Sequence, residues 1–142
     1  MSLKETKITR WYWKQIGGTL IEEYCVVQGR SGQGGRWVDG LIILGTEKKR
    51  LRPRSSYDIT GKDVVVVQSK YRRLNMPLMG QTLFARELVR RLKPRNVESV
   101  AVCISDDSIL RPLLEGHPHC TVKIYPGISR LTPRSKPTAP GE

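Results

Sequence analysis

An amide and an ammonium group stand where an otherwise apolar strand ends. The run DVVVVQSK (63–70) is the clearest strand in the sequence, and its four consecutive valines predict burial on both faces of a sheet. Because side chains alternate along a strand, Gln68 and Lys70 project from one face while Ser69 points away. The end of this strand therefore presents two polar groups side by side.

Asp39 interrupts a second apolar run, RWVDGLIILG (36–45), which is also predicted to be a strand. A buried carboxylate is costly unless it is paired or binds a metal, so Asp39 is a candidate ligand. The alternative is a turn, since Asp39-Gly40 is also a hairpin signal. The Gly-rich segment 29–35 already supplies a connection, which favours the ligand over the turn.

The two strands would place these groups together if they are neighbours in the sheet. Asp39 and Gln68 could then converge on one divalent cation through oxygen ligands, which suit Mg²⁺. Such a metal activates water and stabilises charge on phosphorus, while Lys70 orients the water or neutralises developing charge. The three residues therefore predict a site for phosphodiester hydrolysis.

Positive charge is concentrated in two windows of this 142-residue chain. The net charge is +12, and the windows 47–54 and 70–95 together hold +11 of it. Such clustering predicts a polyanion-binding surface, although a solvated face that keeps the protein soluble is the alternative. An anionic membrane is a less favoured partner, because the basic helix predicted at 78–92 lacks a large aromatic apolar face. The predicted nucleic-acid contacts are Arg72, Arg73, Arg86, Arg90, Lys48, Lys49 and Arg50.

The order of the predicted elements indicates an α/β fold. A helix at 4–16 precedes strands at 19–28, 36–45 and 63–70; then come a helix at 78–92, a strand at 97–105, a short helix and a strand at 120–126. Late alternation of this kind predicts a mixed central sheet of about five strands flanked by helices, as one domain over residues 1–127. Residues 128–142 are predicted to be a basic, Pro-rich disordered tail.

One polar residue of the helix 78–92 points toward the same end of the sheet. Helical spacing places Gln81, Ala85, Leu88 and Leu92 on one stripe, and Gln81 begins it. Gln81 could reach the metal-bound water or the phosphate, or be an exposed residue of the first turn. The arginines of this helix are expected on its opposite, solvated face, where they can follow a phosphate backbone.

The cysteines and the apolar segments of the chain bear on its location. Three cysteines without a CxxC spacing predict buried thiols in a reducing compartment, and no apolar segment is long enough to span a membrane, so the cytoplasm is expected.

In the first helix Trp11, Tyr12 and Trp13 could stack on bases or pack on the sheet. Core packing is favoured for at least one tryptophan.

The motifs together resemble a known superfamily. A helix, a hairpin carrying Val38-Asp39-Gly40, a strand ending in Gln68-Ser69-Lys70 and a further helix are similar to the PD-(D/E)xK nucleases. The phrase VVVVQSKYRR most resembles Mrr-type restriction endonucleases. The similarity covers roughly residues 8–105 and implies a restriction endonuclease-like core that uses Mg²⁺ or Mn²⁺.

This resemblance also implies residue roles. Asp39 would be the metal-ligating aspartate, Gln68 would replace the usual glutamate through its amide oxygen, and Lys70 would be the catalytic lysine. The backbone carbonyl of Ser69 would be a further ligand.

An upstream glutamate is common in such enzymes, and Glu22 or Glu23 matches by position. Adjacent strand residues face opposite ways, so one of the two should reach the site, and Glu23 is the favoured one.

The expected function is a magnesium-dependent DNA endonuclease in restriction, repair or recombination. By analogy, a homodimer would let two sites cut both strands, and a separate specificity subunit is a further candidate partner. The alternatives are a non-catalytic nucleic-acid-binding module on the same fold and a structural protein whose basic face meets an acidic partner.

Overall fold

A six-stranded sheet forms the middle layer of the protein, and the computed structural model describes residues 1–127. The elements are α1 (Leu3–Ile16), β1 (Thr19–Val27), β2 (Arg36–Ile43), β3 (Lys49–Arg50), β4 (Asp63–Ser69), α2 (Met76–Arg90), β5 (Asn96–Cys103), α3 (Leu110–Glu115) and β6 (Cys120–Ile124). The predicted tail, residues 128–142, lies outside the described residues.

The sheet is mixed, with strand order β3-β1-β2-β4-β5-β6. β1 and β2 form an antiparallel hairpin, and β2 pairs antiparallel with β4. β4, β5 and β6 are parallel, and their connections run through α2 and α3. This topology puts β2 beside β4 at the centre, so the strands that carry Asp39 and Gln68 are neighbours, as the predicted site requires.

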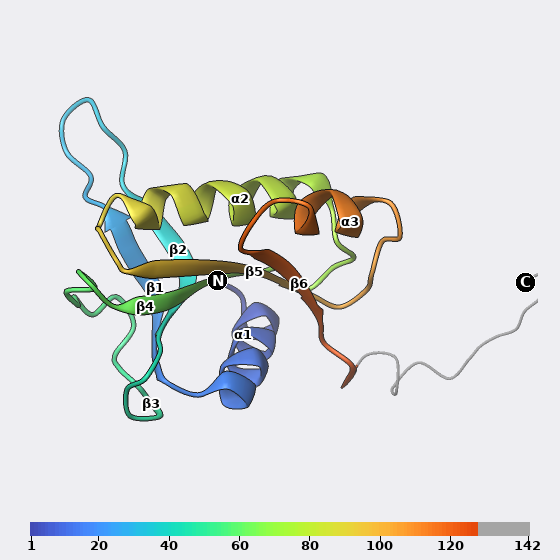
Figure 1. Ribbon diagram of the computed structural model, residues 1–142, viewed down its shortest axis with the longest axis horizontal. Helices are drawn as coiled ribbons and strands as arrows, with labels where there is room; N and C mark the ends of the chain where they lie inside the picture. The colour runs from blue at the N-terminus through green and yellow to red at the C-terminus, as the bar shows by residue number, and fades with distance from the viewer. Residues whose placement is uncertain (128–142) are drawn as a thin grey trace, which may run out of the picture.

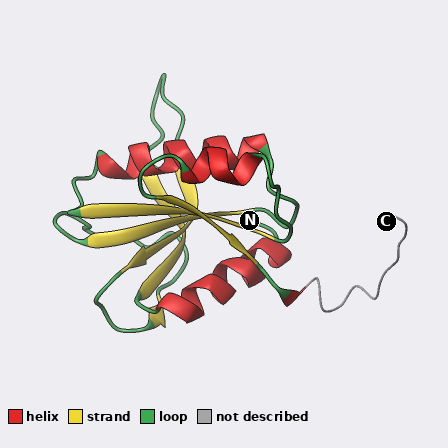
Figure 2. Ribbon diagram, turned by 45° about the vertical axis from the view of Figure 1, so that its right-hand side comes forward, coloured by secondary structure: helices red, strands yellow, loops and turns green. Residues whose placement is uncertain are grey.

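Helices cover both faces of the sheet, α1 on one face and α2 with α3 on the other (Figures 1 and 2). The valines of β4 explain this three-layer arrangement. Val64 and Val66 pack in the core under α2, whereas Val65 and Val67 pack in the core under α1. A strand apolar on both faces is stable only when both faces are covered.

Local signals in the sequence set the helix boundaries. α1 begins with a capping box, in which Ser2 and Glu5 each accept the other's backbone N–H. α1 ends at Gly17, whose φ of 78° lies in the region that favours glycine. Asn75 caps α2 by accepting the N–H of Leu78, so this helix begins two residues before the predicted position.

The α/β class and the mixed sheet are confirmed, and the number of strands is one more than expected. The additional strand is β3, two residues long, which pairs in parallel with the start of β1. A strand this short leaves no periodic pattern, so the sequence placed it in a loop. Within residues 1–127, no helix is both long and apolar enough to cross a membrane.

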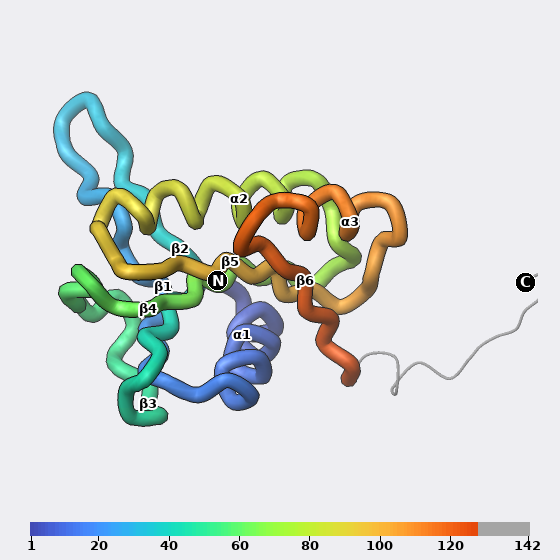
Figure 3. Tube along the Cα trace, viewed as in Figure 1, coloured from blue at the N-terminus to red at the C-terminus, as the bar shows by residue number. Residues whose placement is uncertain are grey.

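The loop between β1 and β2 projects beyond the body of the sheet (Figure 3). It contains the Gly-rich segment 29–35, in which Arg30 and Gln33 form an isolated bridge. The hairpin therefore closes through this segment, and Asp39 lies within β2 rather than in a turn.

Candidate active site

A break in the side-chain alternation of β1 and β2 positions Asp39. Val38 and Leu41 pack in the same core cluster although they are three residues apart, which an uninterrupted strand would not allow. At the same level of β1, Glu23 has a positive φ of 52°. The two strands are therefore irregular together at this level, where β2 carries Asp39.

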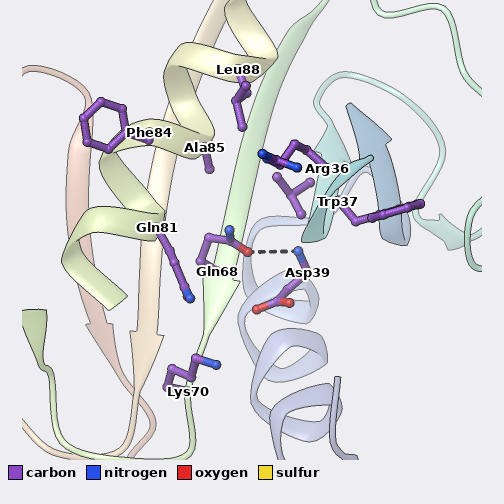
Figure 4. A pocket seen from close by; sticks show the side chains of 10 residues that line it. Arg36, Trp37, Asp39, Gln68, Lys70, Gln81, Phe84, Ala85 and Leu88 are labelled. Atoms are coloured by element: carbon purple, nitrogen blue, oxygen red, sulfur yellow. Dashed lines mark hydrogen bonds between the residues drawn. The ribbon is translucent and has the colours of Figure 1, made fainter. Parts of the chain in front are cut away.

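Asp39 and β4 exchange two hydrogen bonds just beyond the last regular pair of the β2–β4 ladder, Gly40 with Val67. The backbone N–H of Asp39 donates to Oε1 of Gln68 at 2.9 Å, and the backbone N–H of Ser69 donates to Oδ2 of Asp39 at 2.8 Å (Figure 4). These side chains continue the ladder where backbone pairing stops. Both groups are consequently held in defined positions.

The residues predicted to do chemistry line one pocket of about 290 Å³. Asp39, Gln68 and Lys70 come from β2 and the end of β4, and Gln81 reaches down toward them from α2 (Figure 4). The other lining residues are Arg36, Trp37, Val38, Phe84, Ala85 and Leu88. The predicted alternation in β4 and the predicted stripe on α2 both agree with this arrangement.

Lys70 lies one residue past β4 and is half-buried. Its backbone N–H donates to the carbonyl of Val102 at 3.0 Å, which continues the parallel pairing of β4 with β5. Its ammonium group makes no ion pair within the described part of the chain. The positive charge of Lys70 lowers the pKa of Asp39, so the two side chains interact electrostatically.

Asp39 is a carboxylate in a poorly solvated place. Burial raises the pKa of Asp39 above its ordinary value, against the opposing effect of the Ser69 N–H, which favours the charged form. Among residues 1–127 no Lys, Arg or His forms an ion pair with it. This carboxylate therefore carries a desolvation cost that its neighbours, Lys70 included, offset only in part.

Glu5 is a site neighbour that the sequence analysis missed. Its negative charge further raises the pKa of Asp39, and it is half-buried at the start of α1. One helical turn later Thr9 shares a 2.7 Å hydrogen bond between hydroxyls with Ser69. The sequence did contain a signal for this neighbour, because Glu5 and Thr9 are four residues apart and therefore lie on one face of α1.

The two glutamates considered as further ligands have other partners. Glu22 is buried and accepts two hydrogen bonds from Arg10, at 2.7 and 3.0 Å, and pairs with Arg50 at 3.8 Å. Glu23, the favoured candidate, pairs with Arg54 at 3.0 Å, and this contact lowers the pKa of Glu23. Neither glutamate lines the pocket with Asp39.

The predicted nucleic-acid contacts divide into paired and unpaired cations. Lys49 pairs with Glu47, Arg50 with Glu22, and Arg86 and Arg90 with Glu87. Lys48, Arg72 and Arg73 are exposed and make no ion pair within residues 1–127.

The prediction that Arg86 lies on a solvated face of its helix is wrong. Its Nε donates to the carbonyl of Val97 at 2.9 Å, and only 15% of its side chain is exposed. Arg86 packs against the start of β5 because a long side chain can bury its apolar stem while the guanidinium satisfies a backbone carbonyl.

The donor set at the pocket fits a cation that needs few protein ligands. Among the described residues no three His, Cys, Asp or Glu side chains are grouped as a metal cluster. Mg²⁺ is commonly held by one or two carboxylates and completes its shell with water and substrate phosphate. Asp39, with Oδ1 free of hydrogen bonds within residues 1–127, matches that requirement. Glu5 lies outside the lining of the pocket but is close enough for its charge to raise the pKa of Asp39.

The chain matches no protein-family model, no curated protein and no solved structure. The resemblance to PD-(D/E)xK nucleases therefore depends on the motif residues of the sequence and stays a prediction.

Proposed function

We propose that the pocket at Asp39 is the active site of a DNA endonuclease that depends on Mg²⁺ or Mn²⁺ and has a restriction endonuclease-like core. One observation carries this proposal. A half-buried, desolvated carboxylate that forms no ion pair among residues 1–127 lies beside a lysine and two amides, in a chain with a net charge of +12. A divalent cation would offset the desolvation cost of Asp39 and would attract phosphate.

Asp39 is the ligand that would hold the metal. The amide oxygen of Gln68 accepts one hydrogen bond from the Asp39 backbone and keeps a second lone pair for a ligand role. Glu5 takes the place that the resemblance gave to Glu22 or Glu23. The bound metal would supply Lewis acidity, which lowers the pKa of water and neutralises phosphate charge.

Lys70 and Gln81 act on the phosphate and the attacking water. The ammonium of Lys70 faces the region next to Asp39, where it stabilises the negative charge that develops on the phosphate oxygens. Gln81 extends into the pocket from α2 and can donate or accept a hydrogen bond with that water (Figure 4). Arg72 and Arg73 follow Lys70 after one intervening residue, Tyr71, and add the positive charge that draws a nucleic-acid backbone to this end of the sheet.

Cleavage of supercoiled plasmid tests this proposal. The wild-type chain should nick the plasmid with Mg²⁺ or Mn²⁺, and Lys70→Ala should abolish nicking while the far-ultraviolet circular dichroism stays unchanged. Lys62→Ala is the matched control, because Lys62 is an exposed lysine just before the opposite end of β4. Equal cleavage by the wild type and Lys70→Ala would refute the assignment.

One observation favours a second candidate, a non-catalytic nucleic-acid-binding module. Gln68 is uncharged, and the described residues form no cluster of three acidic or other metal-binding side chains. Salt-dependent DNA binding without cleavage of any DNA form, with either metal, would favour this module. The cytoplasmic location, the homodimer and the specificity subunit remain predictions.

A further inference from the structure

A second groove runs along the outer face of α1, on the side of the sheet opposite α2. It has a volume of about 490 Å³ and lies between α1 and the residues that follow β6. It is lined by Leu3, Thr6, Lys7, Arg10, Trp11, Lys14 and Tyr125. None of these residues contributes to the pocket at Asp39.

Lys7 and Lys14 line this groove, Lys4 lies near them on α1, and none of the three pairs with a carboxylate in the described part of the chain. Lys4, Lys7 and Lys14 are exposed, and none of them makes an ion pair among residues 1–127. Helical geometry places the three within about 80° of one another around α1, over roughly 15 Å of its length. Lys48 extends the row, since its ammonium donates to the carbonyl of Lys14 at 3.1 Å.

Aromatic rings alternate with these lysines. The ammonium of Lys4 lies 5.0 Å from the ring centre of Tyr71, and that of Lys7 lies 5.8 Å from the ring of Tyr125. Trp11 meets Tyr125 edge to face, with ring centres 5.5 Å apart and planes at 87°. All three rings are half-buried, so each has surface open to a ligand.

We propose that this groove binds a single strand of nucleic acid. Unpaired lysines along a groove contact successive phosphates, and half-exposed rings supply faces on which bases of any sequence stack. A duplex would present phosphates alone to the same surface and leave the rings unused. An acidic peptide would likewise use the lysines and leave the rings without stacking partners.

Next to the groove, the contact of Lys4 with Tyr71 reaches the chain segment that follows the proposed active site. Tyr71, the ring under Lys4, follows Lys70 directly in the chain. A strand that leaves the pocket past Lys70 would therefore continue along α1 toward Lys48. This continuity rests on the proposed nuclease function, whereas binding in the groove does not depend on catalysis.

Binding of labelled oligothymidylate, measured by fluorescence anisotropy in EDTA over a series of salt concentrations, tests the proposal. Lys7→Gln/Lys14→Gln should weaken binding at least about tenfold and reduce the salt slope by about 1.4, since each lost single-strand phosphate contact removes about 0.7. The matched control is Lys62→Gln/Arg91→Gln, which removes the same charge from exposed residues at the far end of β4 and α2 and should weaken binding less than about threefold.

The rings are tested separately. Trp11→Leu and Tyr125→Leu keep an apolar side chain and should each weaken single-strand binding about fivefold or more through lost stacking. Two different ring variants keep this test decisive if one of them fails to fold. A duplex of the same length should bind less tightly than the single strand, and the ring variants should leave duplex binding unchanged.

Four results would overturn the inference. They are equal weakening by both charge variants, unchanged binding in both ring variants, tighter binding of the duplex, and displacement of the strand by polyglutamate at an equal concentration of charge. Because EDTA excludes metal-dependent cleavage, binding can succeed where the nuclease proposal fails, and the reverse also holds.

Discussion

Two carboxylates on neighbouring strands of this protein, the buried Glu22 and the half-buried Asp39, have different surroundings. Glu22 of β1 lies opposite Gly40, next to Asp39 on β2. Arg10 binds Glu22 through two hydrogen bonds, and Arg50 adds a second guanidinium. Asp39 has one backbone N–H from Ser69 and no ion pair within residues 1–127.

This difference separates a carboxylate with a structural role from the one that we propose as a metal ligand. The chain has 25 Lys and Arg residues, so cations are abundant, yet none of those within residues 1–127 forms an ion pair with Asp39. The cost of burying Glu22 is offset by its arginines, whereas Lys70 and the Ser69 N–H offset the desolvation of Asp39 only in part, since its pKa stays raised. Four experiments test this contrast, ordered from the largest effect to the smallest.

Asp39→Asn should lower the rate of plasmid nicking at least about 100-fold, because it removes the only charged ligand on β2. The protein should also lose its thermal stabilisation by Mn²⁺, which needs no catalysis to be seen. Asp58→Asn is the control, since Asp58 is exposed and its side chain accepts a hydrogen bond from the Thr60 backbone N–H. Retention of both properties in Asp39→Asn would remove Asp39 from the site.

Glu22→Gln should lower the free energy of unfolding by about 2 kcal/mol, because two arginines lose their buried partner. The value is below that of a fully enclosed pair, since the side chains of Arg10 and Arg50 are 35% and 41% exposed. Urea denaturation measures the change. Metal-induced stabilisation should persist in this variant, and its loss would mean that Glu22 is a ligand after all.

Gln68→Glu should strengthen metal binding about tenfold, which corresponds to about 1.4 kcal/mol, by adding a carboxylate that can still accept the Asp39 N–H. Titration of the melting temperature with Mn²⁺ provides the comparison with wild type. If metal affinity falls instead, Gln68 serves to hold Asp39 in place and a second negative charge there is repelled.

The smallest expected effect is a change in the free energy of unfolding with pH. Because the pKa of Asp39 is raised on folding, the unfolded chain releases its proton first as the pH rises. Without metal, the free energy of unfolding of the wild type should therefore fall relative to that of Asp39→Asn as the pH rises from about 3.9, the ordinary pKa of aspartate, to the raised pKa. Above the raised pKa, the difference between the two proteins should stay constant. Urea denaturation of both proteins across this range measures the difference, and a constant difference would contradict the raised pKa.

Part of this site could be predicted because it depends on local repetition. The valines of β4 alternate between two cores, which places Gln68 and Lys70 on one face. Helical spacing likewise brought Gln81 to the pocket with Ala85. Both patterns are properties of a few consecutive residues.

Other parts could not be predicted because they depend on distant residues. Summing charges over two windows left α1 out, since aspartates and glutamates elsewhere in the chain cancel its positive charge in the total. Of the seven predicted nucleic-acid contacts, four are paired with glutamates. The pairing of Arg50 with Glu22 joins residues far apart in the chain.

The sequence by itself determined that β4 would be buried on both faces and that an amide and a lysine would end it. Those outcomes follow from side-chain alternation, which each strand carries within itself. Only the tertiary structure decided which of the two carboxylates would form ion pairs. That choice depends on how α1 and β3 bring Arg10 and Arg50 to Glu22, and contacts between such distant segments leave no periodic trace in the sequence.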